Sequence, residues 1–257
     1  QITSEEGLPS NEVYSLVEDA QGFIWLGCDA GLFKYDGVRF IPFKNENLQS
    51  KSITGLTVSK SGRIYCYTFK GQLFYVENNK MVELKHSLTS ISNIVCDQDG
   101  NLWVNHLNGL SIYNENSKNW NDFTDFSYEK FSYTNSGFVD KLNQYWFVNE
   151  GGLSSIKKSK LSHYEFNYKA INSLSGNFFF ASNSIENNWF ISRINGIIYT
   201  ISEQNKLIEY KDETLIELLK SRKINNIIPL SDNELWICTY TGVVKYDIKL
   251  KTAKLWY

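Results

Sequence analysis

The side chains that could do acid–base, nucleophilic or metal chemistry are few in this sequence and widely separated. Three histidines, His86, His106 and His163, lie far apart and lack the HxxE or HxH spacing of a metal site, so a surface or core role is favoured. Carboxylate pairs such as Asp97 and Asp99 lie in turns and are interpreted as solvated. No glycine-rich loop resembles a phosphate cradle. We therefore expect no catalytic residue, no metal site and no cofactor.

The four cysteines are interpreted as packing residues. They are well separated in the sequence and form no CxxC pair: Cys28, Cys66, Cys96 and Cys238. Three of them lie in or close to apolar strand patterns, which favours small buried hydrophobes. Disulfides are not indicated.

The composition is that of a soluble globular protein. The chain has 257 residues, of which 42% are hydrophobic and 15% aromatic, with a net charge of −2 and a pI near 6.0. Because it has no basic field and no clustered run of Lys and Arg, nucleic acid is not an expected partner. No apolar run approaches the roughly 18 residues of a membrane span, and QITSEEGLPS at the start lacks the layout of a signal peptide. Any signal or membrane anchor is expected outside these residues.

A segment centred on an aromatic residue recurs six times along the chain. The first copy is GFIWLGCDAGLFKYD at 22–36 and the last is NELWICTYTGVVKYD at 233–247. The central aromatics, spaced 40, 38, 43, 43 and 47 residues apart, are Trp25, Tyr65, Trp103, Trp146, Trp189 and Trp236. A glycine follows each anchor by six positions, or by seven in the fifth copy: Gly31, Gly71, Gly109, Gly152, Gly196 and Gly242. We expect the anchors to be equivalent structural plugs between successive sheets.

Each copy has the pattern of four short β-strands. An apolar-alternating strand, such as VYSLVED at 13–19, precedes a polar turn that ends in Gly or Asn, where a positive φ costs least. The aromatic strand, the turn with the fixed glycine, a third strand and a fourth strand such as RFIPF at 39–43 follow. Four strands in about 40 residues indicate a blade of a β-propeller. We predict an all-β fold in which 1–257 form a single propeller domain, with blades near 7–45, 50–86, 90–125, 131–167, 172–211 and 223–257.

The repeat leaves the closure of the ring open. A β-sandwich would also show many short strands, but not a Trp and a Gly locked to this period. A single blade is apolar on both faces, and an open arc would expose two such faces. We expect either a closed ring of six blades or a seventh blade from residues outside this chain. QIT at 1–3 occupies the position of a fourth strand and hints at a piece of a neighbouring blade.

The stretch EGLPSNEVYSLVEDAQGFIWLGCDAGLFKYDGVRF at 6–40 closely resembles the two-component regulator propeller repeat. It shares GLPSN, an Asp followed by Gly and a Trp strand, and GL..YDG. VCDQDGNLWVNHLNGLSIYN at 95–114 carries the same pattern, and the sixth copy keeps the anchors. The second copy departs from it with Tyr65 in place of Trp. The fourth and fifth copies are interpreted as lacking the acidic turn.

This resemblance implies the extracytoplasmic sensor region of a bacterial histidine kinase, as in the hybrid two-component systems of Bacteroidetes. The propeller would lie in the periplasm, and the membrane span and the kinase would belong to other residues. Such regions often bind breakdown products of polysaccharides. The implied partner is therefore an oligosaccharide or a small organic ligand, and the implied state of the full receptor is a homodimer.

Two other classes of function stay open. One is a non-catalytic propeller scaffold for protein–protein contacts. The other, a propeller glycosidase or lyase, is less favoured. DQDGNLW at 97–103 resembles the Asp-box of sialidases, but that box is a structural turn. A sialidase also needs three arginines on one carboxylate, and the arginines here fall at unrelated phases of the repeat: Arg39, Arg63, Arg193 and Arg222.

Two insertions interrupt the repeat. KDETLIELLKSRK at 211–223 places Leu215, Leu218 and Leu219 at helical spacing behind two acidic residues, which predicts a short helix. This helix is interpreted as a cap over an apolar gap, with a partner or dimer contact as the alternative. TDFSYEKFSYTN at 124–135, with four aromatics, is the other insertion.

The turns between second and third strands are the expected ligand-binding elements. In a propeller they share one face with the connections between blades, and specificity generally lies in such loops on a rigid scaffold. Lys70 and Arg193 are predicted anion contacts, and Phe69 or Tyr240 a stacking platform, for a sugar or an organic acid. The candidate ligand-binding residues are Asp29, Phe69, Lys70, His106, Asn108, Asn149, Glu150, Arg193, Asn195 and Tyr240.

Overall fold

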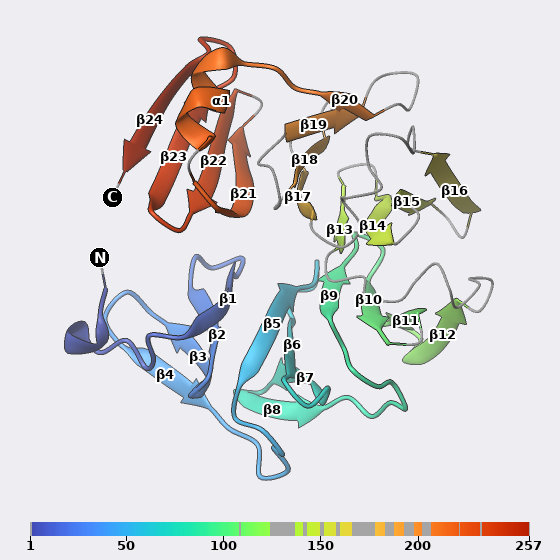
Figure 1. The fold of residues 1–257 in the computed structure, drawn as a ribbon. Coiled ribbons are helices and arrows are strands. Elements are labelled where there is room, and N and C mark those ends of the chain that lie inside the picture. The colour runs from blue at the N-terminus through green and yellow to red at the C-terminus, as the bar shows by residue number, and fades with distance from the viewer. Residues whose placement is uncertain are drawn as a thin grey trace. The chain divides into compact units, whose positions relative to one another are not determined.

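The structure, a computed structural model, consists of repeated β-meanders. It describes residues 2–107, 109–123, 137–140, 143–149, 152–157, 160–165, 178–182, 188–192, 198–201, 207–220, 222–231 and 233–256. These residues form six antiparallel sheets, and each sheet contains four strands that are consecutive in the sequence (Figure 1). The predicted all-β class and its four-stranded repeat are confirmed. The chain divides into two compact units, residues 1–132 and 133–257.

The first unit contains sheets 1 to 3. Sheet 1 consists of β1 (Val13–Glu18), β2 (Ile24–Cys28), β3 (Gly31–Tyr35) and β4 (Phe40–Phe43). Sheet 2 consists of β5 (Ile53–Val58), β6 (Ile64–Thr68), β7 (Leu73–Glu77) and β8 (Lys80–Glu83). Sheet 3 consists of β9 (Asn93–Cys96), β10 (Asn101–His106), β11 (Gly109–Asn114) and β12 (Asn119–Phe123).

The second unit contains sheets 4 to 6 and a helix. Sheet 4 consists of β13 (Gly137–Val139), β14 (Tyr145–Asn149), β15 (Gly152–Lys157) and β16 (Lys160–Glu165). Sheet 5 consists of β17 (Phe178–Ser182), β18 (Asn188–Ser192), β19 (Ile198–Ile201) and β20 (Leu207–Glu209). After helix α1 (Glu213–Leu219), sheet 6 consists of β21 (Ile224–Ser231), β22 (Glu234–Thr239), β23 (Gly242–Asp247) and β24 (Thr252–Trp256).

Two apolar clusters hold the first unit together. One lies between sheets 1 and 2 and includes Trp25, and the other lies between sheets 2 and 3 and includes Tyr65. All five residues of β6 are buried, because sheet 2 is covered on both faces. Sheets 1 and 2 approach so closely that a Cβ on Gly27 would lie 2.8 Å from the carbonyl oxygen of Ile53. A side chain at Gly27 would therefore force the two sheets apart.

The residues before β1 form no strand. Ser4–Glu6 form a short 3-10 helix, in which the Thr3 hydroxyl accepts a hydrogen bond from the Glu5 amide (3.2 Å). The Glu6 carboxylate accepts one from the Thr3 amide (2.6 Å), which completes a capping box. The hint that QIT forms a fourth strand is therefore wrong for Ile2 and Thr3, because the cap turns the chain into a helix.

Three sheets share one corner between their first and second strands. In it the anchor indole donates a hydrogen bond to an aspartate six positions earlier in the sequence. The pairs, with their Nε1–Oδ2 distances, are Trp25 and Asp19 (2.8 Å), Trp103 and Asp97 (2.8 Å), and Trp146 and Asp140 (2.7 Å). A residue with positive φ completes each turn: Gly22 (84°), Gly100 (81°) and Asn143 (58°). The corner thus ties the β-turn to the core through one buried or nearly buried carboxylate.

Two sequence interpretations of these corners are wrong. Asp97 is not solvated: it is only 6% exposed, and Oδ1 accepts hydrogen bonds from the amides of Asp99 and Asn101 (both 2.9 Å). The fourth copy does not lack the acidic turn either, because Asp140 accepts from the Trp146 indole. Asn143 takes the left-handed position that glycine has elsewhere, so the turn is present without its usual glycine.

The other three anchors lie in different surroundings. Tyr65 is 1% exposed, and Ser59 stands at the position of the aspartate. Trp236 is half-buried and donates to the Glu234 carboxylate two positions earlier (2.7 Å). Trp189 lies in β18, paired with β19, and its side chain is outside the described residues.

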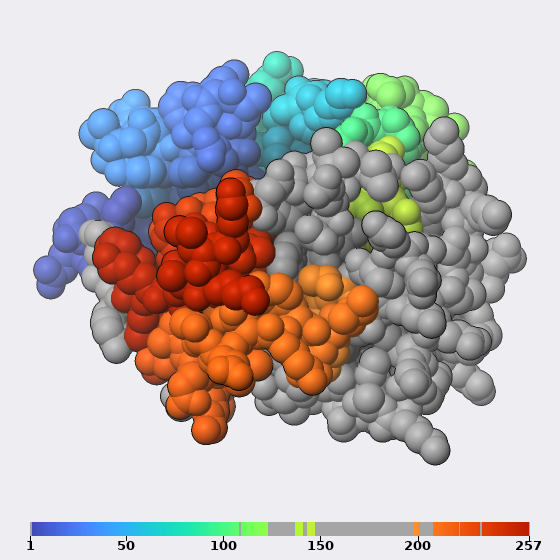
Figure 2. Space-filling model, turned by 90° about the horizontal axis from the view of Figure 1, so that it is seen from above, coloured from blue at the N-terminus to red at the C-terminus, as the bar shows by residue number. Residues whose placement is uncertain are grey.

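The predicted helix in 211–223 is confirmed as α1, and the region around it is orange in Figure 2. The Asp212 carboxylate caps it by accepting from the Leu215 amide (2.9 Å). Leu215 and Leu219 are 2% and 5% exposed and join the apolar cluster of sheet 6, with Leu218 packed against its edge. The helix therefore covers apolar residues of its own unit.

Candidate functional site

The candidate ligand-binding residues fall at the ends of second strands and in the turns that follow. Asp29, Phe69, Lys70 and Tyr240 lie in turns, whereas His106 and Asn149 are the last residues of β10 and β14. The structure describes the backbone of Asn149 but not its side chain. Four candidates lie outside the described residues: Asn108, Glu150, Arg193 and Asn195.

One backbone hydrogen bond holds each described turn against the segment that enters the same sheet. In sheet 1 the Asp29 amide donates to the Glu12 carbonyl (3.3 Å), and in sheet 2 the Phe69 amide donates to the Ser52 carbonyl (3.1 Å). The equivalent pairs are Leu107 and Thr89 in sheet 3, and Tyr240 and Lys223 in sheet 6, both at 3.1 Å. Because the backbone makes these bonds, the turn side chains are free to differ from sheet to sheet.

The turn side chains are exposed, and several are large and apolar. Phe69 is 80% exposed and Tyr240 is 63% exposed, although both are aromatic. Asp29 and Lys70 are also exposed. Leu107 lies in the expected loop from His106 to Asn108 but was not among the candidate ligand-binding residues; it is apolar and 49% exposed. Its apolar character within a polar loop was the available signal.

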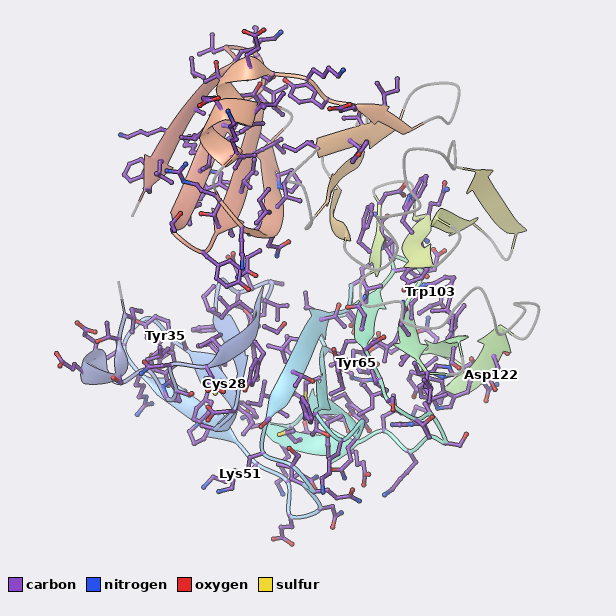
Figure 3. All side chains as sticks on the ribbon, viewed as in Figure 1. Cys28, Tyr35, Lys51, Tyr65, Trp103 and Asp122 are labelled. Carbon is purple, nitrogen blue, oxygen red and sulfur yellow. The ribbon has the colours of Figure 1, made fainter. Side chains whose placement is uncertain are left out.

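His106 is part of an internal hydrogen-bonded chain across sheet 3. Its Nε2 lies 2.9 Å from the hydroxyl of Ser111, and that hydroxyl donates to Asp122 Oδ1 at 2.6 Å. These residues belong to β10, β11 and β12, and Asp122 is labelled in Figure 3. Because the single hydroxyl proton goes to the carboxylate, the histidine must donate from Nε2. Burial holds the pKa of His106 below its ordinary value, while Asp122 opposes that shift.

The turns of sheets 2 and 3 meet at one connecting segment. Residues 84–92 join β8 to β9, and a Cβ on Gly71 would lie 3.6 Å from the Ser90 amide nitrogen and 3.7 Å from that of Ile91. The sheet 3 turn touches the same segment through the bond from Leu107 to Thr89. The turn that carries Phe69 and Lys70 and the turn that carries Leu107 therefore both lie against residues 89–91. Within the first unit, Asp29 has no such link to this segment among the described contacts.

Other kinds of site find little support among the described residues. No group of three or more His, Cys, Asp and Glu side chains there is placed to hold a metal ion. The four cysteines are free, and burial raises the pKa of the Cys28 and Cys66 thiols, which disfavours the reactive thiolate. In the same part of the chain no helix is both long and apolar enough to cross a bilayer.

A family model matches the beginning of the chain. Residues 7–30 match the two-component regulator propeller family. They include β1, β2 and the corner of Asp19 and Trp25, and they end in the turn that holds Asp29. The chain carries a two-component regulator propeller repeat. The resemblance seen in the sequence is confirmed.

A curated relative agrees with this match. Histidine kinase P4 from Formosa agariphila is 27% identical over 198 residues, which cover 66% of this chain and 14% of the relative. This chain thus matches only a small part of that protein, which is named as a histidine kinase.

Solved structures establish the β-propeller fold. A catalytically inactive variant of virginiamycin B lyase from Staphylococcus aureus, solved with quinupristin, superposes with a TM-score of 0.76 at 14% identity and covers 97% of this chain and 86% of its own. The extracellular domain of a protein assigned as a hybrid two-component system from B. thetaiotaomicron gives a TM-score of 0.69 at 15% identity, over 96% of this chain and 36% of its own. At these identities the likeness concerns the fold alone.

Proposed function

We propose that this propeller is the extracytoplasmic sensor domain of a two-component histidine kinase and that it binds a carbohydrate or another small ligand. The observation that carries the proposal is the two-component regulator propeller repeat at 7–30, in a chain related to a histidine kinase. The kinase belongs to residues outside this chain, so the fragment itself catalyses nothing. A homodimer of the full receptor would carry the signal across the membrane.

The ligand is proposed to bind over the turns of sheets 2 and 3. Phe69 offers an exposed aromatic face and Lys70 a neighbouring cation, a combination that suits a sugar ring with an acidic substituent. Leu107 lies in the turn that bonds to Thr89 of the same connection. The aromatic side chain costs little conformational entropy to order on binding, since it has only two rotatable bonds.

A second candidate function is a scaffold for a protein partner. Apolar side chains also protrude at the opposite end of two sheets, where Val38 in the turn from β3 to β4 is 87% exposed and Leu250 in the turn from β23 to β24 is 69% exposed. Exposed apolar tips of this kind support protein contacts more than sugar binding. This candidate does not require the turns of sheets 2 and 3.

A thermal-shift titration of the chain against neutral and uronate-containing oligosaccharides tests the proposal. With protein concentration and buffer fixed, a bound sugar is expected to raise Tm in a dose-dependent way set by its affinity. The double variant F69A/K70A should lose the shift. Val38→Ala should keep it, because Val38 is similarly exposed but lies in the neighbouring sheet 1, at the opposite end from the proposed ligand-binding turns. Loss of the shift in both variants, or in neither, would place the ligand elsewhere.

The same samples, analysed also by mass spectrometry, distinguish the sensor from an enzyme and from a scaffold. If mass spectrometry of the incubated sugar finds cleavage products, the chain is a lyase or hydrolase, as one of its structural neighbours is a lyase. If no compound shifts Tm, the scaffold is favoured over the sensor. The location is tested separately by fusing alkaline phosphatase after residue 256 in the complete protein, where activity is expected only outside the cytoplasm.

A further inference from the structure

The outer edge of sheet 6 is exposed, basic and partly apolar. It runs from the turn after β23 through β24, the outermost strand of the sheet (Figure 1). We call its exposed residues the basic edge: Lys249, Leu250, Lys251, Thr252, Lys254 and Trp256. Leu250 is 69% exposed and Trp256 is 49% exposed. The stretch 249–256 thus has three lysines, two exposed large apolar side chains and no acidic residue.

The fourth strands of the first unit have a different pattern of charge. β8 contains both Lys80 and Glu83, and β12 contains Asp122. Just before β4, Arg39 pairs with Asp36 at 3.3 Å. Each of these edges therefore carries an acid or pairs its cation with one. No lysine of the basic edge pairs with a carboxylate among the residues that the structure describes.

The acids close to the basic edge leave it with an excess of positive charge. Asp247, at the end of β23, accepts a hydrogen bond from the Leu250 amide at 2.8 Å. Glu234 of β22 is bound to Lys245 at 2.8 Å. Helix α1 packs against β24 and adds one exposed acid, Glu213. These carboxylates do not neutralise three lysines, so the edge attracts a negatively charged surface.

The apolar tip of the basic edge is not needed by the fold. Ile248 packs against the apolar cluster of sheet 6, and its amide donates to the Asn233 carbonyl at 2.8 Å. Leu250 lies outside that cluster, and Lys251 beside it has a left-handed φ of 51°. The turn is therefore fixed by its own backbone. A contact between this tip and another surface would cost little further ordering of the chain.

The side chains of the basic edge favour lipid over protein as the partner. The Lys254 ammonium lies 4.2 Å from the centroid of the Trp256 ring. An amphipathic indole and lysines with long apolar stems are typical of the boundary between membrane and water. The centres of protein interfaces, in contrast, are depleted in lysine. In addition, Lys254 faces Lys245 across the two strands, a like-charge pair that an anionic surface would relieve.

We propose that the basic edge of sheet 6 rests on a lipid bilayer that contains anionic lipids. Its lysines would lie among the head groups, and Leu250 would enter the boundary with the acyl chains. Each lysine near such a surface strengthens partitioning by about fivefold, so the contact is too weak to recruit a free protein. Its use rests on the proposed function, in which other residues hold the propeller near the membrane. The surface itself requires neither a ligand nor a kinase.

Sedimentation of the chain with vesicles tests the contact. One set of vesicles is phosphatidylcholine alone, and the other is an equal mixture of phosphatidylcholine and phosphatidylglycerol. We expect partitioning at low salt to be about 100-fold stronger on the anionic vesicles, because three lysines contribute. The difference should disappear in about 0.5 M salt, which screens the charges. Equal partitioning on both sets of vesicles at low salt would overturn the proposal.

Three variants assign the binding to the edge. K249Q/K251Q should weaken partitioning on the anionic vesicles by about 30-fold. The matched control K60Q/K80Q removes two exposed lysines of sheet 2, and thus the same net charge, and should bind as wild type does. Leu250→Ser should weaken binding but keep its dependence on salt. An equal loss in the two double variants would reduce the effect to net charge and refute the site.

An acidic protein partner is the competing occupant of the basic edge. Poly-glutamate, added in place of vesicles, reports on it. Binding of poly-glutamate that K249Q/K251Q abolishes, together with no binding to anionic vesicles, would assign the edge to a protein and overturn the proposal. Vesicle binding that Leu250→Ser leaves unchanged would refute insertion of the tip. No sugar enters these measurements, so a failure of the ligand titration would not change their outcome.

Discussion

The two ends of the sheets in the first unit differ in a consistent way. Where first and second strands meet, sheets 1 and 3 have the same corner, with a buried or nearly buried aspartate bound to the anchor indole. Where second and third strands meet, the turns share a backbone hydrogen bond and a glycine with positive φ, but their other side chains are as different as Asp29, Phe69 and Leu107. The corners of sheets 1 and 3 therefore repeat the same side-chain hydrogen bonds, whereas the turns at the opposite end repeat only their backbone conformation and contacts.

This difference separates the residues that hold the fold from those available for binding. The corner carboxylates of Asp19 and Asp97 are not available to a ligand, because they already accept hydrogen bonds from the turn and from the indole. At the variable end the scaffold does not depend on the turn side chains, so they can be exchanged without loss of the fold. A ligand site is therefore expected at the variable end.

Sheet 2 is the exception at the uniform end. Ser59 and Tyr65 replace the aspartate and the tryptophan, and the acid comes instead from the next sheet. The Arg63 guanidinium pairs with Glu77 of its own sheet and with Glu115 of sheet 3, both at 3.1 Å. The Ser59 hydroxyl still closes the corner of sheet 2 by accepting from the Arg63 amide (3.2 Å), and the ion pair joins this corner to the neighbouring sheet as well.

Removal of one corner carboxylate is expected to have the largest effect on stability. Asp97→Ala leaves the Trp103 indole and the amides of Asp99 and Asn101 without an acceptor in a buried site. We expect the free energy of unfolding to fall by about 3 kcal/mol, since each buried donor without a partner is costly and bonds to a carboxylate are strong. Urea denaturation followed by tryptophan fluorescence measures the loss.

The matched control is an aspartate at the other end. Asp29→Ala removes an exposed carboxylate from a turn and should change stability by no more than about 0.5 kcal/mol. Similar losses in the two variants would show that the corners do not carry the fold and would remove the basis for the comparison.

Much of the fold could be predicted because it depends on local residue patterns. The alternating apolar residues, the anchor aromatics and the turn glycines act within one meander, so their spacing predicts the strands of all six sheets. The corner at Asp140 is hard to predict from the sequence because its turn lacks the glycine found in sheets 1 and 3. The corners of sheets 1, 3 and 4 share the aspartate six positions before the anchor, and in sheet 4 Asn143 replaces the glycine.

The site could be predicted only in outline, because its contacts join distant parts of the sequence. The turns were placed correctly by the strand pattern, but nothing local links Gly71 to Ser90 or His106 to Asp122. Glu115 is a further example, since its partner Ser61 lies 54 residues earlier. Such pairs depend on how neighbouring sheets pack, which a repeat pattern does not specify.

The ion pair between sheets 2 and 3 offers a smaller test. Glu115→Gln keeps the shape of the side chain but removes the charge that Arg63 meets at 3.1 Å. We expect stability to fall by about 1 kcal/mol, because the guanidinium is partly exposed and keeps its pair with Glu77. The difference from wild type should shrink in 1 M salt. A loss as large as that of Asp97→Ala, or one unaffected by salt, would mean that sheet 2 has a buried corner of its own.

The smallest effect on stability is expected at Phe69. This side chain is 80% exposed, so Phe69→Ala removes little packing and should change the free energy of unfolding by no more than about 0.5 kcal/mol. An aromatic ring that contributes nothing to the fold and yet stands in water has a cost in solubility, and binding is what would compensate for it. Urea denaturation of Phe69→Ala beside Tyr65→Ala, which empties a buried position in the adjoining strand, measures the contrast. If Phe69→Ala proved as damaging as Tyr65→Ala, the turn would be part of the scaffold, and the variable end would no longer be the place to look for a ligand.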